Sequence, residues 1–207
     1  MKSKTKIIII MGVAGCGKST IGAMLAHELG WDFYDADDFH SESNRIKMAQ
    51  NIPLTDEDRA DWLDSLRSLI GQNIQNEKSI VLACSALKKS YRDILGNPHN
   101  QYVAASGFTA KQSPHQDKEV AHLHCNKRSA AQVSGKTPSQ RHIEFIYLRG
   151  TYEQIETRLL QRSGHFMSAK MLTSQFDILE EPHDALTIDI THTPQEIISI
   201  IRKGLAL

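Results

Sequence analysis

Five short runs rich in apolar residues, separated by longer stretches of mixed character, set the pattern of this chain. The first, residues 6–11, is mostly isoleucine, and a β-branched run of this length is typical of a buried strand. Four more runs predict further strands, at residues 31–35, 79–84, 143–148 and 185–190. Between the runs, apolar residues return at helical spacing. Alternating strands and helices predict one α/β domain over residues 1–207, with a five-stranded parallel sheet and helices on both faces.

Local signals mark where several helices begin and end. Threonines that precede an acid or amide by three positions open three of them: Thr55 with Asp58, Thr151 with Gln154, and Thr193 with Glu196. Two further helices are expected at residues 44–50 and 169–179, and a short one follows the third strand and stops near Gly96.

Residues 101–141 differ in character from the rest of the chain. They are rich in Ser, Gln, His and Ala, with scattered Gly and Pro and no strand or helix period. A long stretch of this kind inside a compact domain is either a functional loop or a disordered insertion. Its composition favours a disordered surface insert, because too little apolar surface is available to hold one conformation.

Composition and charge narrow the class of protein. The chain carries 24 Lys and Arg against 24 Asp and Glu, so no global positive field exists to hold nucleic acid or an anionic membrane. No apolar run approaches the roughly 20 residues that a membrane-spanning helix requires. Three cysteines are too few for a disulfide framework and fit a reducing compartment. We therefore expect a soluble, cytoplasmic protein.

The segment after the first strand matches the phosphate-binding motif G-x-x-x-x-G-K-[ST]. It consists of Gly12, Val13, Ala14, Gly15, Cys16, Gly17, Lys18, Ser19 and Thr20. A strand, a glycine loop and a helix start point backbone N–H groups and the positive helix end at a phosphate chain. Lys18 would reach the β- and γ-phosphates of ATP, and the Ser19 hydroxyl would coordinate Mg²⁺. The alternative is a glycine-rich turn without a ligand, which the flanking elements make the weaker interpretation.

Cys16 lies inside this loop, and two interpretations of it stay open. The helix dipole and Lys18 would favour a reactive thiolate. Alternatively, cysteine is simply a small residue that fills the loop position.

The acidic residues decide how the nucleotide is used. The Asn-Lys-x-Asp motif of GTPases is absent, because its nearest match at residues 126–129 lacks the acid. Motor and transporter ATPases carry an acid at the end of an apolar strand, whereas the third and fourth strands end in Cys84-Ser85 and Arg149-Gly150.

An acidic cluster follows the second strand instead, as in small-molecule kinases. Asp37 is the candidate to accept a proton from a substrate hydroxyl, and Asp35 lies nearer the metal. The alternative is that these acids and Asp38 only cap the next helix.

Several blocks of the sequence resemble the gluconokinase family, in the family's order and over essentially all of the chain except residues 97–142. They include Asp35-Ala36-Asp37-Asp38-Phe39-His40, Pro53-Leu54-Thr55-Asp56-Glu57-Asp58-Arg59, residues 84–93, Gly164-His165-Phe166-Met167 and residues 175–182. The resemblance implies ATP-dependent phosphorylation of D-gluconate to 6-phospho-D-gluconate. It also implies a P-loop kinase fold like that of shikimate kinases, with a small helical lid. Asn51 replaces a usual glycine, but asparagine tolerates the left-handed backbone, so the turn should survive.

Gluconate is a small carboxylate with many hydroxyls, so its pocket should offer a cation. Basic residues follow the second and third strands, at Lys47, Arg59, Lys88, Lys89 and Arg92. Arginine grips carboxylates bidentately, which ranks Arg59 first, then Arg92, then Lys47. Each could instead be a solvated surface charge, and we expect that of either Lys88 or Lys89.

The resemblance places the lid around residues 162–182, where it would exclude water from the transferred phosphoryl group. Arg158 and Arg162 precede the Gly-His-Phe block, and at least one of them should contact ATP phosphate. His165 would either touch substrate or stabilise the lid.

Two other functions compete with gluconate phosphorylation. The chain could phosphorylate another small hydroxy acid such as shikimate. It could also be a catalytically silent nucleotide-binding module whose basic insert docks a partner, although intact Lys18, Ser19 and Asp37 argue against this. Small kinases of this kind are often homodimers, so self-association is a further expectation.

Overall fold

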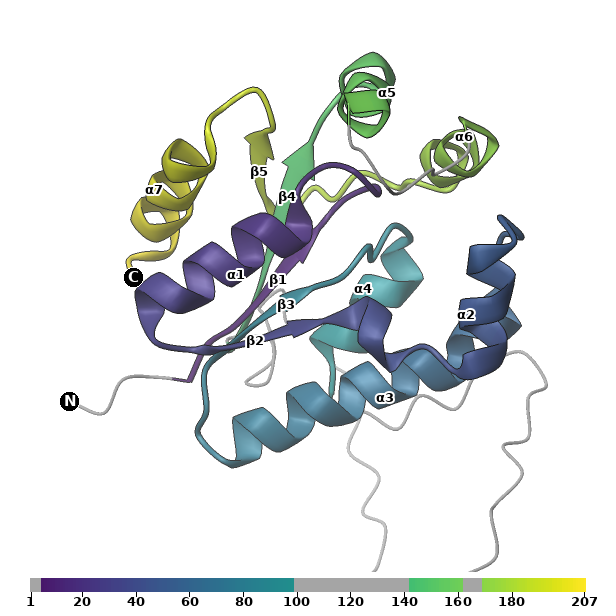
Figure 1. The fold of residues 1–207 in the computed structure, drawn as a ribbon. Helices are drawn as coiled ribbons and strands as arrows, with labels where there is room; N and C mark the ends of the chain where they lie inside the picture. The colour runs from purple at the N-terminus through teal and green to yellow at the C-terminus, as the bar shows by residue number, and fades with distance from the viewer. Residues whose placement is uncertain (1–4, 99–141, 162–168) are drawn as a thin grey trace, which may run out of the picture.

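The structure is a computed structural model that describes residues 5–98, 142–161 and 169–207 (Figure 1). The insert predicted at residues 101–141 lies outside the described residues, as do the first seven residues of the predicted lid. In the described ranges, no helix combines the length and the apolar character needed to cross a membrane.

A five-stranded parallel sheet forms the centre of the domain, in the order β2-β3-β1-β4-β5. Its strands are β1 (Ile7–Met11), β2 (Asp32–Asp35), β3 (Ile80–Ala83), β4 (Ile143–Arg149) and β5 (Leu186–Asp189). The predicted strands are confirmed, with ends that differ by one residue at most. The predicted fold class is confirmed as well.

β1 is the middle strand, and every one of its side chains is fully buried. Because successive side chains point to opposite faces, Ile8 and Ile10 join one apolar cluster while Ile7, Ile9 and Met11 join another. A strand that is apolar on both faces must be covered on both, which explains why helices flank the sheet on each side.

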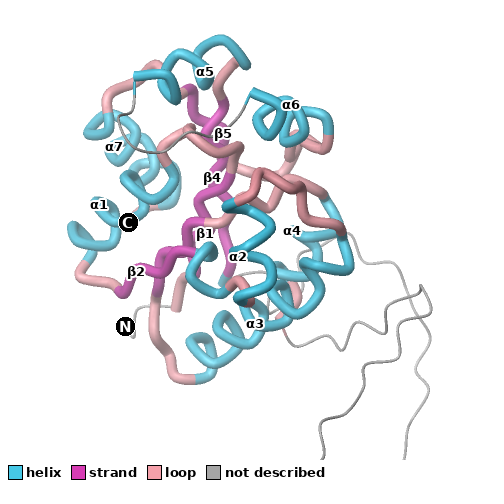
Figure 2. The backbone as a smooth tube through the Cα atoms, turned by 45° about the vertical axis from the view of Figure 1, so that its right-hand side comes forward, coloured by secondary structure: helices cyan, strands magenta, loops and turns pink. Residues whose placement is uncertain are grey.

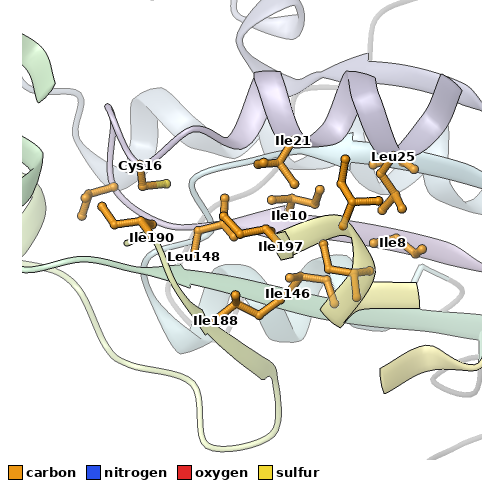
Figure 3. Close-up of a cluster of buried hydrophobic side chains, with 14 of the residues drawn as sticks. Ile8, Ile10, Cys16, Ile21, Leu25, Ile146, Leu148, Ile188, Ile190 and Ile197 are labelled. Atoms are coloured by element: carbon orange, nitrogen blue, oxygen red, sulfur yellow. The ribbon is translucent and has the colours of Figure 1, made fainter. Parts of the chain in front are cut away.

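The two faces of the sheet carry different helices (Figure 1). On one face lie α1 (Lys18–Leu29) and α7 (Pro194–Leu205), and Figure 3 shows Ile21, Leu25 and Ile197 of these helices around the β1 isoleucines. On the other face lie α3 (Asp56–Gln75) and α4 (Lys89–Gly96). The carboxyl ends of the strands point toward the remaining helices, α2 (Glu42–Ala49), α5 (Tyr152–Gln161) and α6 (Ala169–Asp177) (Figures 1 and 2).

The predicted helix starts are confirmed by their hydrogen bonds. Full capping boxes open α3 at Thr55 and α7 at Thr193, and Thr151 and Gln154 bond each other reciprocally before α5. Asn51 has a φ of 56°, so it takes the left-handed backbone conformation expected of it. α6 ends at Asp177, two residues earlier than predicted.

Leu66 on α3 provides a test of how much this packing stabilises the domain. It is 0% exposed, so Leu66→Ala removes buried methyl groups and leaves a cavity against the sheet. We expect the free energy of unfolding to fall by about 2–5 kcal/mol, measured by urea unfolding followed by circular dichroism. Leu160→Ala on α5 is the matched control: Leu160 is 73% exposed, and its loss should change stability by less than about 0.5 kcal/mol. Equal effects at the two sites would contradict the assigned packing.

Candidate active site

The phosphate-binding loop connects β1 to α1, and its backbone needs glycine. Gly12 has a φ of 140°, and a Cβ there would lie 2.8 Å from the carbonyl oxygen of Leu148. Gly17, with a φ of 103°, caps the start of α1. The Lys18 Nζ donates to the carbonyl oxygen of Val13 at 3.0 Å, so its ammonium lies across the loop. This is the strand–loop–helix arrangement that directs donors toward a phosphate chain.

Ser19 and Asp35, the two predicted Mg²⁺ ligands, lie side by side. Ser19 lies in the first turn of α1 and Asp35 ends β2, and the Ser19 hydroxyl donates to the Asp35 carboxylate at 2.5 Å. In the described part of the chain, no three His, Cys, Asp or Glu side chains gather to hold a metal by themselves. A hydroxyl and one carboxylate fit Mg²⁺ nevertheless, because Mg²⁺ usually combines one or two carboxylates with phosphate oxygens and water.

Asp37 lies beside this pair on a short 3₁₀-helix, η1 (Ala36–Phe39), and its backbone N–H donates to Asp35 at 3.1 Å. Although the residue borders solvent, the surrounding protein partly desolvates the carboxylate and raises its pKa. Repulsion from Asp35 and Asp38 adds to this, and attraction to Lys18 opposes it. A raised pKa makes a carboxylate a stronger proton acceptor, which suits the role predicted for Asp37.

A stacked ring pair holds η1 against α3. The His40 ring lies on the Trp62 ring at 4.7 Å between centroids and 9° between planes, and the Trp62 Nε1 donates to the Ala36 carbonyl at 2.7 Å. Burial, and then the charges of Arg59 and Arg45, lower the pKa of His40 to about 4, so this imidazole is neutral at neutral pH. Within the described ranges its buried Nδ1 has no hydrogen-bond partner.

Arg59 and Lys88, two of the predicted substrate cations, come together around Tyr91. The Arg59 guanidinium donates to the carbonyl oxygens of Leu54 at 2.7 Å and Thr55 at 3.3 Å, and lies 5.8 Å from the centre of the Tyr91 ring. The Lys88 Nζ lies 5.6 Å from the same ring centre. The structure therefore joins the segments after β2 and β3 into one basic site.

The other basic candidates are placed differently. Lys47 pairs with Asp58 at 2.6 Å, at the edge of the same region. Lys89 pairs with Asp93 at 2.6 Å, one helical turn along α4, with its side chain 71% exposed, so it is the solvated member of the Lys88–Lys89 pair.

Arg92, ranked second after Arg59 for the substrate's carboxylate, makes its described contacts within the protein. The residue is buried, and its guanidinium donates to the carbonyl oxygens of Ala86 at 3.0 Å and Leu87 at 2.9 Å. Ala86 has a φ of 43°, so these bonds hold the turn between β3 and α4 in an unusual conformation. These contacts favour a structural role, which the charge and spacing of Arg92 alone do not distinguish from a binding role.

The nucleotide side of the site is bordered by α5. Arg158 on this helix donates to the carbonyl oxygen of Ile190, the residue directly after β5. A Cβ at Gly15 would lie within 3.2 Å of Leu159 and Ile155, so α5 packs directly on the phosphate loop. Arg162 and His165, the other residues expected here, lie outside the described residues.

Gln175 on α6 is a site residue that sequence reasoning did not single out. Its Oε1 accepts the backbone N–H of Ala14 at 2.7 Å, which ties the described part of the predicted lid to the phosphate loop. Beyond α6, the Glu180 backbone N–H donates to Leu87 at 3.0 Å and its carboxylate accepts the Lys89 backbone N–H at 2.5 Å. The only sequence signal was a glutamine in a family block, and its partner lies 161 residues away.

Cys16 is buried, with 1% of its surface exposed, in the apolar cluster beneath the loop (Figure 3). A Cβ on Gly12 would lie 2.9 Å from its Sγ. This burial favours the packing interpretation over a reactive thiolate, because a reagent could reach the sulfur only if the loop opened.

Comparison with known proteins agrees with this geometry. The family model described as shikimate kinase matches residues 14–162. A probable gluconokinase of Rattus norvegicus is 46% identical over 176 residues, covering 85% of this chain and 83% of the relative.

Two crystal structures show the same architecture. An unliganded sugar kinase from Janibacter sp. HTCC2649 has a TM-score of 0.73 and 32% identity, covering 98% of this chain and 95% of its own. A gluconokinase from Sinorhizobium meliloti 1021 has a TM-score of 0.71 and 29% identity, covering 99% of this chain and 94% of its own. With its phosphate loop, its paired acids after β2 and these relatives, the chain belongs to the gluconokinase family, on the fold of the shikimate kinases.

Proposed function

We propose that this protein transfers the γ-phosphoryl group of ATP to a hydroxyl of D-gluconate, forming 6-phospho-D-gluconate and ADP. The observation that carries the proposal is the meeting of the phosphate loop, the Ser19–Asp35 pair and Asp37 at the carboxyl ends of β1 and β2. Open α/β sheets bind ligands at this edge. The gluconokinases among its relatives support the choice of acceptor.

On this proposal, residues 12–20 hold the ATP phosphates through backbone N–H groups, and Lys18 stabilises the charge on the transferred group. Arg158 contributes from α5, and Arg162 from outside the described residues. Ser19 and Asp35 hold Mg²⁺, which neutralises phosphate charge when it is bound.

Asp37 accepts the proton of the attacking hydroxyl while that oxygen bonds to the γ-phosphorus and ADP leaves. Arg59 and Lys88 receive the substrate's carboxylate, with Lys47 at the edge of the same region. His165, outside the described residues, would touch substrate or stabilise the lid, whose role would be to exclude water.

The balanced charge of the chain supports a small-molecule acceptor over nucleic acid, and its few cysteines support a cytoplasmic location. Self-association as a homodimer stays a prediction that sedimentation velocity can check.

ADP release from ATP and Mg²⁺, measured with each of several small hydroxy acids, tests the acceptor. We expect D-gluconate to give the highest kcat/KM, with phosphate found on gluconate by mass spectrometry. A higher kcat/KM for shikimate would show that shikimate is the acceptor, and the protein would still be a small-molecule kinase. No ADP release above background with any of the acids would favour the catalytically silent module.

Asp37→Asn keeps the shape of the side chain but removes the proton acceptor. We expect kcat to fall by about 10²–10⁴-fold, while the KM for ATP changes less than about twofold. Steady-state kinetics measures both, and Asp38→Asn, on the same 3₁₀-helix, is the matched control that should keep most of the activity. If ATP affinity collapsed in Asp37→Asn, Asp37 would belong to the metal side and Asp35 would be the better candidate for the base.

Residues 101–141 can be replaced by a short Gly-Ser linker to test whether they belong to the active domain. The end of α4 lies close to β4, because a Cβ on Gly96 would be 3.8 Å from the Phe145 ring. A short connection should therefore span the gap, and a shorter flexible loop costs less entropy to close. We expect kcat/KM for gluconate to stay within a few-fold. Insoluble protein would show that the segment packs into the fold.

A further inference from the structure

The basic site that should receive the substrate's carboxylate already holds a carboxylate of the protein. Asp56, the first residue of α3, accepts hydrogen bonds from the Lys88 Nζ at 2.7 Å on each of its two oxygens. The Tyr91 hydroxyl donates to the same carboxylate, and the Arg59 guanidinium lies 3.9 Å from it. The bonds from Lys88 and Tyr91 lower the pKa of Asp56, which keeps this side chain ionised.

Asp56 is the most exposed of the three charged side chains in this cluster. The side chains of Lys88 and Arg59 are 26% and 20% exposed, and both lie close to the Tyr91 ring. Arg59 is further held by the carbonyl oxygens of Leu54 and Thr55. The Asp56 side chain is 63% exposed and stands on the solvent side of the cluster. A carboxylate that is already near water loses little when it swings away.

The charges of the cluster also favour an exchange of carboxylates. Lys88 and Arg59 carry two positive charges against the single negative charge of Asp56, so a further anion is attracted to the site. Asp56 nevertheless occupies two of the three N–H groups of the Lys88 ammonium. An incoming carboxylate can form a two-oxygen pair with Lys88 only when Asp56 gives way.

We propose that Asp56 is an internal competitor of the substrate: the carboxylate of gluconate displaces the Asp56 carboxylate from Lys88 and Tyr91 as it binds. Asp56 thereby sets the affinity for the acid substrate and keeps the cations paired in its absence. The inference rests on the proposed function, because it takes gluconate as the acid that enters the site.

Asp56→Asn tests the exchange, since it keeps the size of the side chain and removes the competing charge. Calorimetric titration with gluconate should show about fivefold tighter binding, the size expected when a partly exposed ion pair of up to 1 kcal/mol is no longer broken. The KM for gluconate should fall in parallel, and the KM for ATP should not change. Unchanged or weaker gluconate binding would overturn the proposal and make Asp56 a residue that positions Lys88.

Asp64→Asn is the matched control, on the same helix. Asp64 is 66% exposed and pairs with Arg67 at 3.0 Å, so the change removes an equally exposed, paired charge two turns further along α3. Its gluconate affinity should equal that of the wild type. If Asp64→Asn bound gluconate as much more tightly as Asp56→Asn does, the loss of one negative charge anywhere on the helix would explain the gain. That result would overturn the exchange.

A double variant separates competition from a general structural effect. Lys88→Met should weaken gluconate binding, and adding Asp56→Asn to it should then give little further gain, because the ammonium for which the two carboxylates compete is gone. A full fivefold gain in the Lys88→Met background would contradict competition at Lys88. If Asp56→Asn does not fold, Asp56→Ser repeats the test, since serine is tolerated at the start of a helix.

The two proposals fail separately. If wild-type protein does not phosphorylate gluconate but Asp56→Asn binds it more tightly, the proposed function falls and the exchange stands. If wild-type protein phosphorylates gluconate and Asp56→Asn shows no gain, the exchange falls alone. If neither the wild type nor Asp56→Asn bound gluconate, the proposed function and the proposed exchange would both be overturned.

Discussion

The burial of β1 on both of its faces is the constraint on which the rest of the structure depends. Its side chains are fully buried, alternately in two separate apolar clusters, so neither face can be left to solvent. The free energy gained by removing this apolar surface from water holds helices against both sides of the sheet. Since β1 is also the middle strand, the loop that follows it opens at the centre of the sheet's edge. The phosphate-binding loop therefore takes its position from the same burial that stabilises the fold.

The site built on this edge separates two kinds of electrostatic environment. On the phosphate side, the carboxylates of Asp35 and Asp37 lie close enough to repel each other, and Lys18 offsets this only in part. On the acceptor side, the cations of Arg59 and Lys88 are satisfied by protein oxygens. On the proposed function, selectivity on the acceptor side would depend on how well a ligand replaces existing partners, because net charge alone attracts any small anion.

Structural features that depend on residues close together in the sequence could be predicted. Features that depend on contacts between residues far apart in the sequence could not. The strands, the phosphate loop and the helix caps follow from local patterns, and the pairing of Ser19 with Asp35 follows from parallel strands ending at one edge. The burial of Arg92 depends on a turn whose unusual backbone is invisible in the residue order. The contacts of Gln175 and Asp56 join segments 161 and 32 residues apart, and side-chain identity does not specify such partners.

The position of β1 in the sheet also bears on how the chain folds while it is being translated. β1 leaves the ribosome first, but its neighbours are β3 and β4, and β4 follows only after more than half of the chain has been made. Until then the nascent chain can assemble only β1, β2 and β3, with one edge of a wholly apolar strand unpaired. Unpaired apolar edges of this kind invite aggregation. The middle strand of the finished sheet is thus the strand whose second edge waits longest for its partner.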